Sequence, residues 1–287
     1  MDGGQRRPDD HVHTLVCGAL ALEVDAACGG RVTAFRLDGH NVLSGPDANS
    51  DNFGSTFWTS PQTDWGWPPV AEIDSAPYDA RRDEGGSALA LIGPVAPSLG
   101  VRVEKRFVAR PQRQAFAIDY RICNARAVPV RAAPWEVTRV HPGGLTFFPT
   151  GDGVYPPSNL TVAEAGGATW FAYDRSRIAG HPKLFADAGA GWLAHVDAGA
   201  RTLFLKAFPP VPRAQQAPGE ALIEIYAHPD FTYVELEQQG ACAAIAAGAH
   251  AAWSVNWYLR RLPADVPVAT GSAPLLAFVR AVLAGQE

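Results

Sequence analysis

The amino-acid sequence predicts an all-β protein, a large antiparallel β-sandwich with few short helices. Apolar and polar residues alternate along much of the chain, most clearly over residues 116–122, and this period of two is typical of strands with one buried face. The 24 prolines and 28 glycines fall in nearly every gap between such segments, where they favour turns. Helical periodicity occurs only over residues 275–283, which predict one short amphipathic helix.

The strand predictions follow the chain from its first alternating segment. A turn at Cys28-Gly29-Gly30 and a hairpin signal at Asp38-Gly39 separate the first three strands. The expected strands are residues 20–24, 31–37, 41–43, 101–103, 116–122, 128–140, 192–196, 202–208, 221–226, 232–237 and 251–260. Because neither a repeat nor a linker divides them, residues 13–287 are expected to form a single domain behind a disordered leader of residues 1–12.

Charge and composition exclude several classes of partner. The formal net charge is −5 and no basic run exceeds two residues, which argues against nucleic acid, because its binding depends on clustered Lys and Arg. No apolar stretch approaches the roughly 18 residues that a membrane span needs, and the N-terminal residues make a poor secretory signal. A cytoplasmic protein is therefore expected, and the sequence does not indicate its oligomeric state.

The cysteines and histidines show no metal-binding or disulfide pattern. Cys17, Cys28, Cys123 and Cys242 are widely spaced and include no Cys-x-x-Cys pair, so they are expected to be free, buried thiols in a reducing compartment. The histidines lack a zinc-binding spacing. Gly-x-Ser-x-Gly, Walker and Rossmann patterns are absent, which excludes serine hydrolases, nucleotide hydrolases and dinucleotide oxidoreductases. A protein without metal or cofactor is expected.

Residues 233–239, Tyr-Val-Glu-Leu-Glu-Gln-Gln, are the most informative stretch for function. In a strand, Glu235 and Glu237 point to one face about 7 Å apart, while Leu236 points to the other. Two such carboxylates raise each other's pKa unless solvent or cations intervene. A solvated face gains little from this arrangement, whereas a sugar site gains hydrogen-bond acceptors and a candidate general base.

An aromatic segment, residues 54–69, is expected to be a loop. It combines Trp58, Trp65 and Trp67 with Gln62 and several hydroxyl groups. Indole rings offer apolar area to the C–H face of a pyranose, while amides and hydroxyls bind its hydroxyl groups. The alternative is that these rings close one end of the sandwich. Because Pro and Gly stiffen the loop, and loops on scaffolds often carry function, the pattern favours a ligand-binding wall.

Taken together, these segments resemble the galactose mutarotase-like superfamily, the β-supersandwich of aldose 1-epimerases. Residues 22–43 are similar to the family's opening hairpin, and Leu236-Glu237-Gln238-Gln239 is similar to the segment that carries its catalytic Glu. Gly-Ser-Thr-Phe-Trp-x-Ser-Pro-Gln, Trp-Gly-Trp-Pro-Pro and Glu-Leu-Glu are most similar to a bacterial branch known only as a domain of unknown function. The resemblance runs from about residue 15 to 262 and is more specific for the fold than for the reaction.

The resemblance implies an aldose 1-epimerase-like isomerase that interconverts sugar anomers by general acid–base catalysis. Glu237 would be the base, and Glu235 would raise its pKa. His141 is the natural acid because its pKa lies near neutrality, with Glu136, kept protonated by burial, in reserve. The expected substrate-binding residues are Trp58, Gln62, Trp65, Trp67, Arg139, Lys206 and Glu235.

The sequence departs from the family in one respect that leaves other functions open. The Asn-His-x-x-Phe-Asn and His-x-Tyr-Phe-Asn motifs of the family are absent, and residues 134–144 stand in their place, so Glu237 alone carries the hypothesis of mutarotation. His141 is also typical of a surface turn, and Arg139 of a structural ion pair with Glu136 or Glu237. A non-catalytic carbohydrate-binding protein fits every feature equally well.

A glycoside hydrolase or lyase, using Glu136 and Glu237 as its carboxylate pair, is a further alternative. The identity of the sugar stays open among hexoses, sugar phosphates and uronic acids. The absence of a Lys/Arg cluster favours a neutral or simple acidic sugar.

Overall fold

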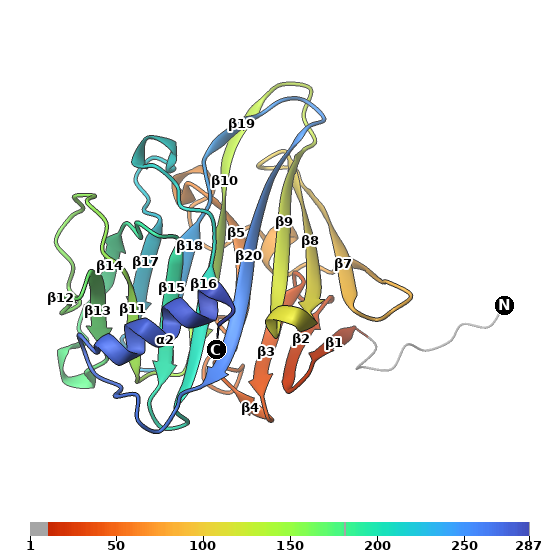
Figure 1. Cartoon of the computed structure of the whole chain (residues 1–287). Helices are drawn as coiled ribbons and strands as arrows, with labels where there is room; N and C mark the ends of the chain where they lie inside the picture. Colours follow the sequence, from red (N-terminus) through yellow and green to blue (C-terminus); the bar gives the residue numbers. More distant parts are fainter. Residues whose placement is uncertain (1–10, 181, 287) are drawn as a thin grey trace.

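The computed structural model describes residues 11–180 and 182–286. Within these ranges the chain forms two antiparallel ten-stranded sheets that pack face to face (Figure 1). The expectation of an all-β sandwich with few helices is confirmed.

The first sheet carries the candidate site. Its strands are β1 (Val12–Cys17), β2 (Leu20–Asp25), β3 (Arg31–Leu37), β4 (His40–Asn41), β5 (Ser55–Ser60), β10 (Val130–Val140), β14 (Lys183–Ala186), β17 (Ile223–Ala227), β18 (Val234–Gln239) and β19 (Ala243–Ile245). Their order is β1-β2-β3-β5-β10-β18-β17-β14, with β4 beside β3 and β19 beside β10. Strands β10 and β18, distant in sequence, therefore lie together at the centre of this sheet.

The second sheet closes the sandwich. Its strands are β6 (Asp79–Arg82), β7 (Ala88–Ala96), β8 (Val101–Arg110), β9 (Ala115–Asn124), β11 (Leu145–Pro149), β12 (Ala163–Ala165), β13 (Ala168–Ala172), β15 (Trp192–Asp197), β16 (Thr202–Ala207) and β20 (His250–Arg261). The order is β12-β13-β11-β15-β16-β20-β9-β8-β7-β6. The chain crosses repeatedly between the two sheets.

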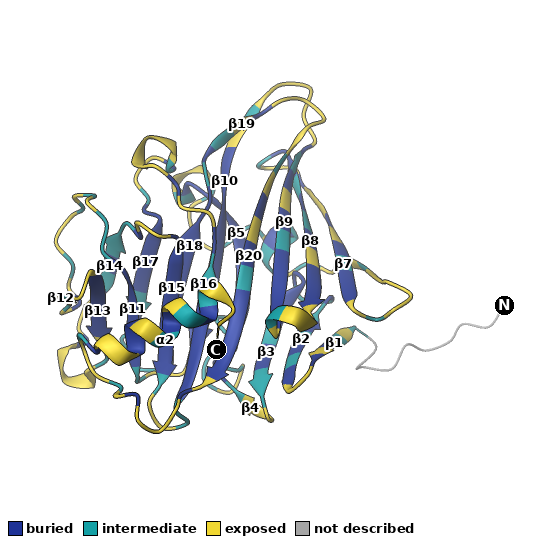
Figure 2. Ribbon diagram, viewed as in Figure 1, coloured by how far each residue is buried: buried dark blue, intermediate teal, exposed yellow. Residues whose placement is uncertain are grey.

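Two α-helices accompany the sheets, α1 (Ala71–Asp74) and α2 (Ala273–Ala284). Short 3-10 turns are η1 (Gln62–Asp64), η2 (Pro111–Arg113), η3 (Arg175–Arg177) and η4 (Arg213–Gln215). Helix α2 confirms the predicted helix near the end, and it packs its apolar face on the outside of the second sheet, in front of β11, β15 and β16 (Figures 1 and 2). Val282 is fully buried there, and Leu283, which the periodicity placed on the apolar face, is only partly buried.

Aromatic rings form the core between the sheets. Phe35 of the first sheet contacts Phe116, Phe204 and Trp257 of the second, with ring centroids 5.5–5.9 Å apart. Edge-to-face and tilted contacts of this kind add to the stabilisation from burial alone. These contacts join β3 to three strands of the opposite sheet.

Residues 54–69 correct one sequence expectation. The segment begins as strand β5, between β3 and β10, and only residues 61–69 form a loop. All six residues of β5 are buried, because Phe57 faces the second sheet while Trp58 is covered on the other side. A strand buried on both faces has no alternating pattern to detect, which also accounts for β11 and β13, strands that the sequence did not predict.

Three other expectations concern the N-terminal leader, the cysteines and the absence of a membrane span. The predicted leader, residues 1–12, lies mostly outside the described residues, and β1 begins at Val12. All four cysteines are free, and Cys28 and Cys123 are only partly buried. In the described part of the chain, no helix is long and apolar enough to cross a membrane. The cytoplasmic location stays a prediction.

Candidate functional site

Strand β18 places its glutamates on the face of the first sheet that points away from the second sheet, here called the outer face. Glu237 lies opposite Val137 of β10 on one side and opposite Glu224 of β17 on the other. Leu236 points inward to the core. The expectation that Glu235 and Glu237 share one face, and Leu236 the other, is confirmed by their contacts.

Glu224 and Glu237, here called the carboxylate pair, share one ammonium group. The Nζ atom of Lys183 lies 2.6 Å from Oε2 of Glu224 and 3.4 Å from Oε1 of Glu237. The other oxygen of Glu237 accepts a hydrogen bond from the indole nitrogen of Trp135 at 3.0 Å. Glu224 Oε1 accepts from the Ala221 amide and the Gln239 side chain, both at 3.1 Å.

Burial dominates the electrostatics of this group. Glu224 is 0% exposed and Glu237 is 1% exposed. Burial raises the pKa of Glu237 well above its usual value, Lys183 opposes the change, and Glu224 and Glu235 add to it. Burial likewise raises the pKa of Glu224 to about 7, against the effect of Lys183. For Lys183, burial disfavours the ammonium form, but Glu237 and Glu224 outweigh that effect and raise its pKa.

Because two acids surround one cation, the carboxylate pair binds a proton near neutral pH. Directly opposed residues of an antiparallel pair have Cβ atoms about 5 Å apart, and like charges at that distance cannot both form cheaply without solvent. Glu224 receives three donors, whereas Glu237 receives the indole N–H and the longer Lys183 contact. The contacts therefore favour the charge on Glu224 and the proton on Glu237.

An indole cluster borders the carboxylate pair. The ring of Trp135 lies 5.4 Å from that of Trp58 and 6.3 Å from that of Trp65. Trp67 contacts Trp58 edge-on at 6.2 Å. The structure thus brings the three predicted tryptophans together and joins them, through Trp135, to Glu237.

Helix α1 holds Trp58 in place. Asp74, its last residue, accepts hydrogen bonds from the Trp58 indole at 2.8 Å and from Arg31 at 3.1 Å. The helix approaches closely because Gly29 has no side chain: its φ is +65°, and a Cβ there would lie 1.9 Å from the Asp74 carbonyl oxygen. The Cys28-Gly29-Gly30 turn therefore positions part of the aromatic cluster.

Arg139 and Glu235 form the other end of the outer face. Arg139 Nε donates to Glu235 Oε1 at 2.9 Å, and its guanidinium lies over the rings of Trp58 and Tyr233. The partner of Arg139 is thus Glu235, where the sequence suggested Glu136 or Glu237. Arg139 is 0% exposed. Its buried guanidinium packs against the ring of Trp58, and its positive charge compensates the negative charge of Glu235.

Loops cover the remaining side of the carboxylate pair. The backbone N–H of Gln62 donates to Glu220 at 2.7 Å, and Ala217 packs on Ala133 of β10. The segment 211–221 therefore crosses the outer face to meet the aromatic loop. The Lys183 side chain, which contacts both glutamates, is 26% exposed and is the accessible member of this group.

Two predicted site residues, Glu136 and Lys206, lie on the opposite side of the sheet. Glu136 is paired with Gln238 in the register, one position away from Glu237, so alternation directs it into the core between the sheets. There it accepts hydrogen bonds from Tyr120 at 2.6 Å and Trp257 at 3.1 Å, and Lys206 Nζ lies 2.9 Å away. Lys206 also donates to Thr138 and to the Leu236 carbonyl oxygen.

This placement corrects three expectations. Glu136 cannot serve as an acid beside Glu237, nor can the two form a glycosidase pair, because a sheet separates their side chains. Lys206 cannot bind a sugar at the outer face for the same reason. Both residues instead hold β10 and β18 against the second sheet.

His141 is also remote from Glu237. It follows the end of β10, four positions beyond the residue opposite Glu237, a separation of about 13 Å along a strand. Desolvation lowers its pKa, and Asp197 and His40 are the charged and titratable groups that act on it. The structure therefore does not bring the expected acid to the expected base.

The residues that sequence reasoning missed are Glu224, Lys183 and Trp135. Glu224 lies in a predicted strand, but a hairpin that paired residues 221–226 with 232–237 end to end would have set it opposite Val234, and the observed register sets it opposite Glu237. The chain contains only three lysines, at 105, 183 and 206. Because lysine is usually exposed, such scarcity was a usable signal: Lys105 and Lys206 are buried and Lys183 is partly covered.

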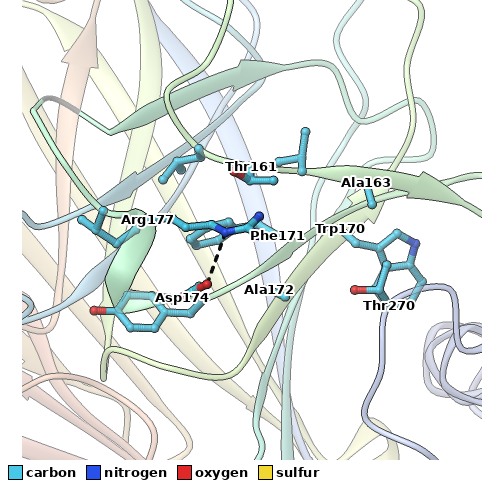
Figure 3. A pocket seen from close by; sticks show the side chains of 12 residues that line it. Thr161, Ala163, Trp170, Phe171, Ala172, Asp174, Arg177 and Thr270 are labelled. Carbon is cyan, nitrogen blue, oxygen red and sulfur yellow. Dashed lines mark ion pairs between the residues drawn. The ribbon is translucent and has the colours of Figure 1, made fainter.

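Four hollows lined by described residues are not lined by Glu224 or Glu237. Figure 3 shows a cavity of about 330 Å³ beside β12 and β13, where Arg177 points toward Asp174 and pairs with it at 3.3 Å. Its walls include Trp170, Phe171 and Thr270, and neither Glu224 nor Glu237 lines it. We place the candidate site at the carboxylate pair because the perturbed titratable groups gather there. In the described residues, no group of three or more His, Cys, Asp or Glu could hold a metal ion.

Comparison with solved structures identifies the fold. The Slr1438 protein from Synechocystis sp. PCC 6803 has a TM-score of 0.61 and 13% identity, over 91% of this chain and 100% of that one. A galactose mutarotase-like protein from Lactobacillus casei ATCC 334 has a TM-score of 0.58 and 11% identity, over 87% and 100%. A galactose mutarotase related enzyme from Lactobacillus acidophilus has a TM-score of 0.60 and 6% identity, over 87% of this chain and 97% of that one.

These likenesses confirm the galactose mutarotase-like fold that the resemblance implied. No family model matches the chain, and no curated protein matches it. At such low identities the likeness concerns the fold, and the reaction has to be argued from the site.

Proposed function

We propose that this chain is a carbohydrate-active protein, and specifically an aldose 1-epimerase-like isomerase whose acid–base pair is Glu224 and Glu237. One observation carries the proposal: two buried glutamates, directly opposed on β17 and β18, both contact the Lys183 ammonium group. Carboxylates whose surroundings separate their protonation states are suited to act as acid and base together.

Anomer exchange requires only proton transfers around the sugar ring. In ring opening, ionised Glu224 accepts the proton of the anomeric hydroxyl while protonated Glu237 donates to the ring oxygen, and the bond between C1 and that oxygen breaks. The aldehyde rotates. In ring closure Glu237 removes the proton from the hydroxyl and Glu224 returns a proton to the carbonyl oxygen, so both groups regain their starting states. In ring opening Glu224 thus takes the role of base that the sequence assigned to Glu237, and Glu237 acts as a base only in ring closure. No cofactor enters the reaction.

Access to the carboxylate pair depends on Lys183. Its amine occupies the position where sugar hydroxyl groups would contact both carboxylates, and its side chain is the partly exposed member of the group. The sugar would displace this amine, with the indole cluster as its apolar wall. Trp58, Trp65, Trp67 and Gln62 remain proposed binding residues, with Arg139 and Glu235 as their support.

Polarimetry on freshly dissolved α-D-glucose and α-D-galactose tests this proposal. Wild-type protein should accelerate the approach to anomeric equilibrium, and Glu237→Gln or Glu224→Gln should reduce that acceleration by a factor of about 10² or more, as expected for a lost acid or base. Glu84→Gln, which changes an exposed glutamate, is the matched control and should match wild type. A wild-type protein that leaves both anomer exchange rates unchanged would contradict the isomerase.

A non-catalytic carbohydrate-binding protein is the second candidate. The nearly complete burial of Glu224 and Glu237 favours it, because Trp65 and Trp67 are the more accessible groups. Saturation-transfer NMR separates the two: sugar signals that respond to the protein without accelerated anomer exchange would support binding alone.

A further inference from the structure

The indole of Trp67 is the most unusual apolar group on the surface. Its exposed fraction is 63%, and among the described residues the other large apolar side chains this exposed or nearly so are valines and one isoleucine. A tryptophan has more apolar area to bury than any of them. Leaving it in solvent forgoes stabilisation that burial would supply, so its position needs another explanation.

The loop holds Trp67 outward rather than leaving it free to collapse. The carbonyl oxygen of Gln62 accepts from the amides of Trp65 and Gly66, at 3.1 and 2.8 Å. The Trp65 indole donates to the Thr59 carbonyl oxygen at 2.8 Å. Pro68 and Pro69 follow directly, and their rings restrict the backbone beyond Trp67. The exposed ring is therefore presented by a well-anchored loop.

Trp67 is also continuous with the candidate site. Its edge-on contact with Trp58 joins it to Trp135, whose indole donates to Glu237. Two ring contacts thus connect Trp67 to the indole that binds Glu237, and Trp67 is the exposed member of this series. The same loop offers exposed polar groups, Thr63 and Asp64, which suit the hydroxyl groups of a sugar lying on the ring.

We propose that Trp67 is the stacking platform of a second sugar subsite, which binds the neighbouring residue of a disaccharide or longer saccharide whose reducing unit lies at Glu237. This inference rests on the proposed carbohydrate function and specifies its ligand class. The exposed indole face takes the C–H face of the second ring, so saccharides of two or more units bind more tightly than the corresponding monosaccharide.

Titration calorimetry on the full chain tests the subsite, with D-glucose, maltose, cellobiose, D-galactose and 6-O-galactobiose as probes. At least one disaccharide should bind wild type about tenfold more tightly than its monosaccharide, equivalent to about 1.4 kcal/mol. Trp67→Ala should remove that advantage, because it should weaken the binding of the disaccharide about tenfold more than the binding of the monosaccharide. Trp67→Phe should retain part of it. Val16→Ala, at a valine 64% exposed on the edge strand β1, should change neither affinity.

The results of this titration distinguish a failure of the second subsite from a failure of the proposed carbohydrate function. Equal affinity for mono- and disaccharides, or an equal loss of both in Trp67→Ala, overturns the subsite while the monosaccharide site stands. If no probe binds wild type, both the subsite and the proposed carbohydrate function are overturned. If Trp67→Ala unfolds at the same midpoint temperature as wild type, a folding defect is excluded as the cause of lost binding.

Discussion

At the scale of residues, the site depends on how few positive charges accompany its carboxylates. Arg139 balances Glu235, and among the described residues Lys183 is the cation that contacts both Glu224 and Glu237. An excess acid in a buried group raises the pKa because the second negative charge can be neither solvated nor paired. The consequence is a proton held near neutral pH, which a general acid needs and which an exposed glutamate does not hold.

The pH dependence of stability should reveal this proton. The folded pKa of Glu224 is about 7, above the ordinary value of about 4.3, so its stabilising contribution is complete below about pH 4 and is lost as pH rises through 7. The free energy of unfolding of wild type should therefore fall relative to Glu224→Gln between pH 5 and 8, by roughly 1 to 3 kcal/mol. Urea denaturation at each pH measures it.

Glu84→Gln again serves as the control, since this exposed glutamate should leave the wild-type profile unchanged. Parallel profiles for wild type and Glu224→Gln over this range would show that Glu224 titrates normally, and would remove the basis for Glu224 as a group that exchanges a proton near neutral pH.

At the scale of elements, a second buried ion pair supports the site from behind. Glu136 and Lys206 are both 0% exposed and lie 2.9 Å apart between the sheets. Lys206 also donates to the carbonyl oxygen of Leu236, the residue between Glu235 and Glu237. Strand β18 is thus fixed on the core side by a lysine from β16, while its glutamates are fixed on the outer face.

Lys206→Met should lower the free energy of unfolding by about 3–5 kcal/mol, because it leaves Glu136 charged, buried and without its cation. The double variant Glu136→Gln, Lys206→Met should recover part of this loss, since the unpaired charge is gone. Chemical denaturation of the three proteins measures both effects.

The exposed ion pair between Arg261 and Asp38, 2.9 Å apart, provides the comparison. Arg261→Met should cost less than about 1 kcal/mol, because solvent screens exposed pairs. A Lys206→Met loss as small as that of Arg261→Met would show that the interior pair contributes little to stability.

At the scale of the whole molecule, the sandwich is held by rings that cross between the sheets. Phe35 is 0% exposed and contacts three aromatic rings of the opposite sheet. The site lies outside this core, on the far face of the first sheet. A core ring such as Phe35 can therefore be substituted without removing a contact of the carboxylate pair, and Trp67 can be substituted without removing a contact of the core.

Phe35→Ala should lower the free energy of unfolding by about 3–5 kcal/mol, the usual cost of a cavity left by a buried ring. Trp67→Ala, at the exposed ring, should change it by no more than about 0.5 kcal/mol. Calorimetric unfolding of both variants tests the contrast, and a similar loss in the two would mean that Trp67 belongs to the core.

The sequence by itself determined the class of fold, most of the alternating strands, the C-terminal helix, and the shared face of Glu235 and Glu237. Those features are local: turn residues and a period of two are written in consecutive positions. It did not reveal β5, β11 or β13, because strands covered on both faces carry no alternation, and it also missed β1, β6, β7, β12, β14 and β19.

Only the tertiary structure decided which acids meet. Strand register set Glu224 opposite Glu237 and turned Glu136 to the other side of the sheet, and a shift of one residue would have reversed the sides. Lys183 reached the pair from β14, far away in sequence. A single sequence does not record such long-range pairings, since they depend on how the strands are ordered in the sheet.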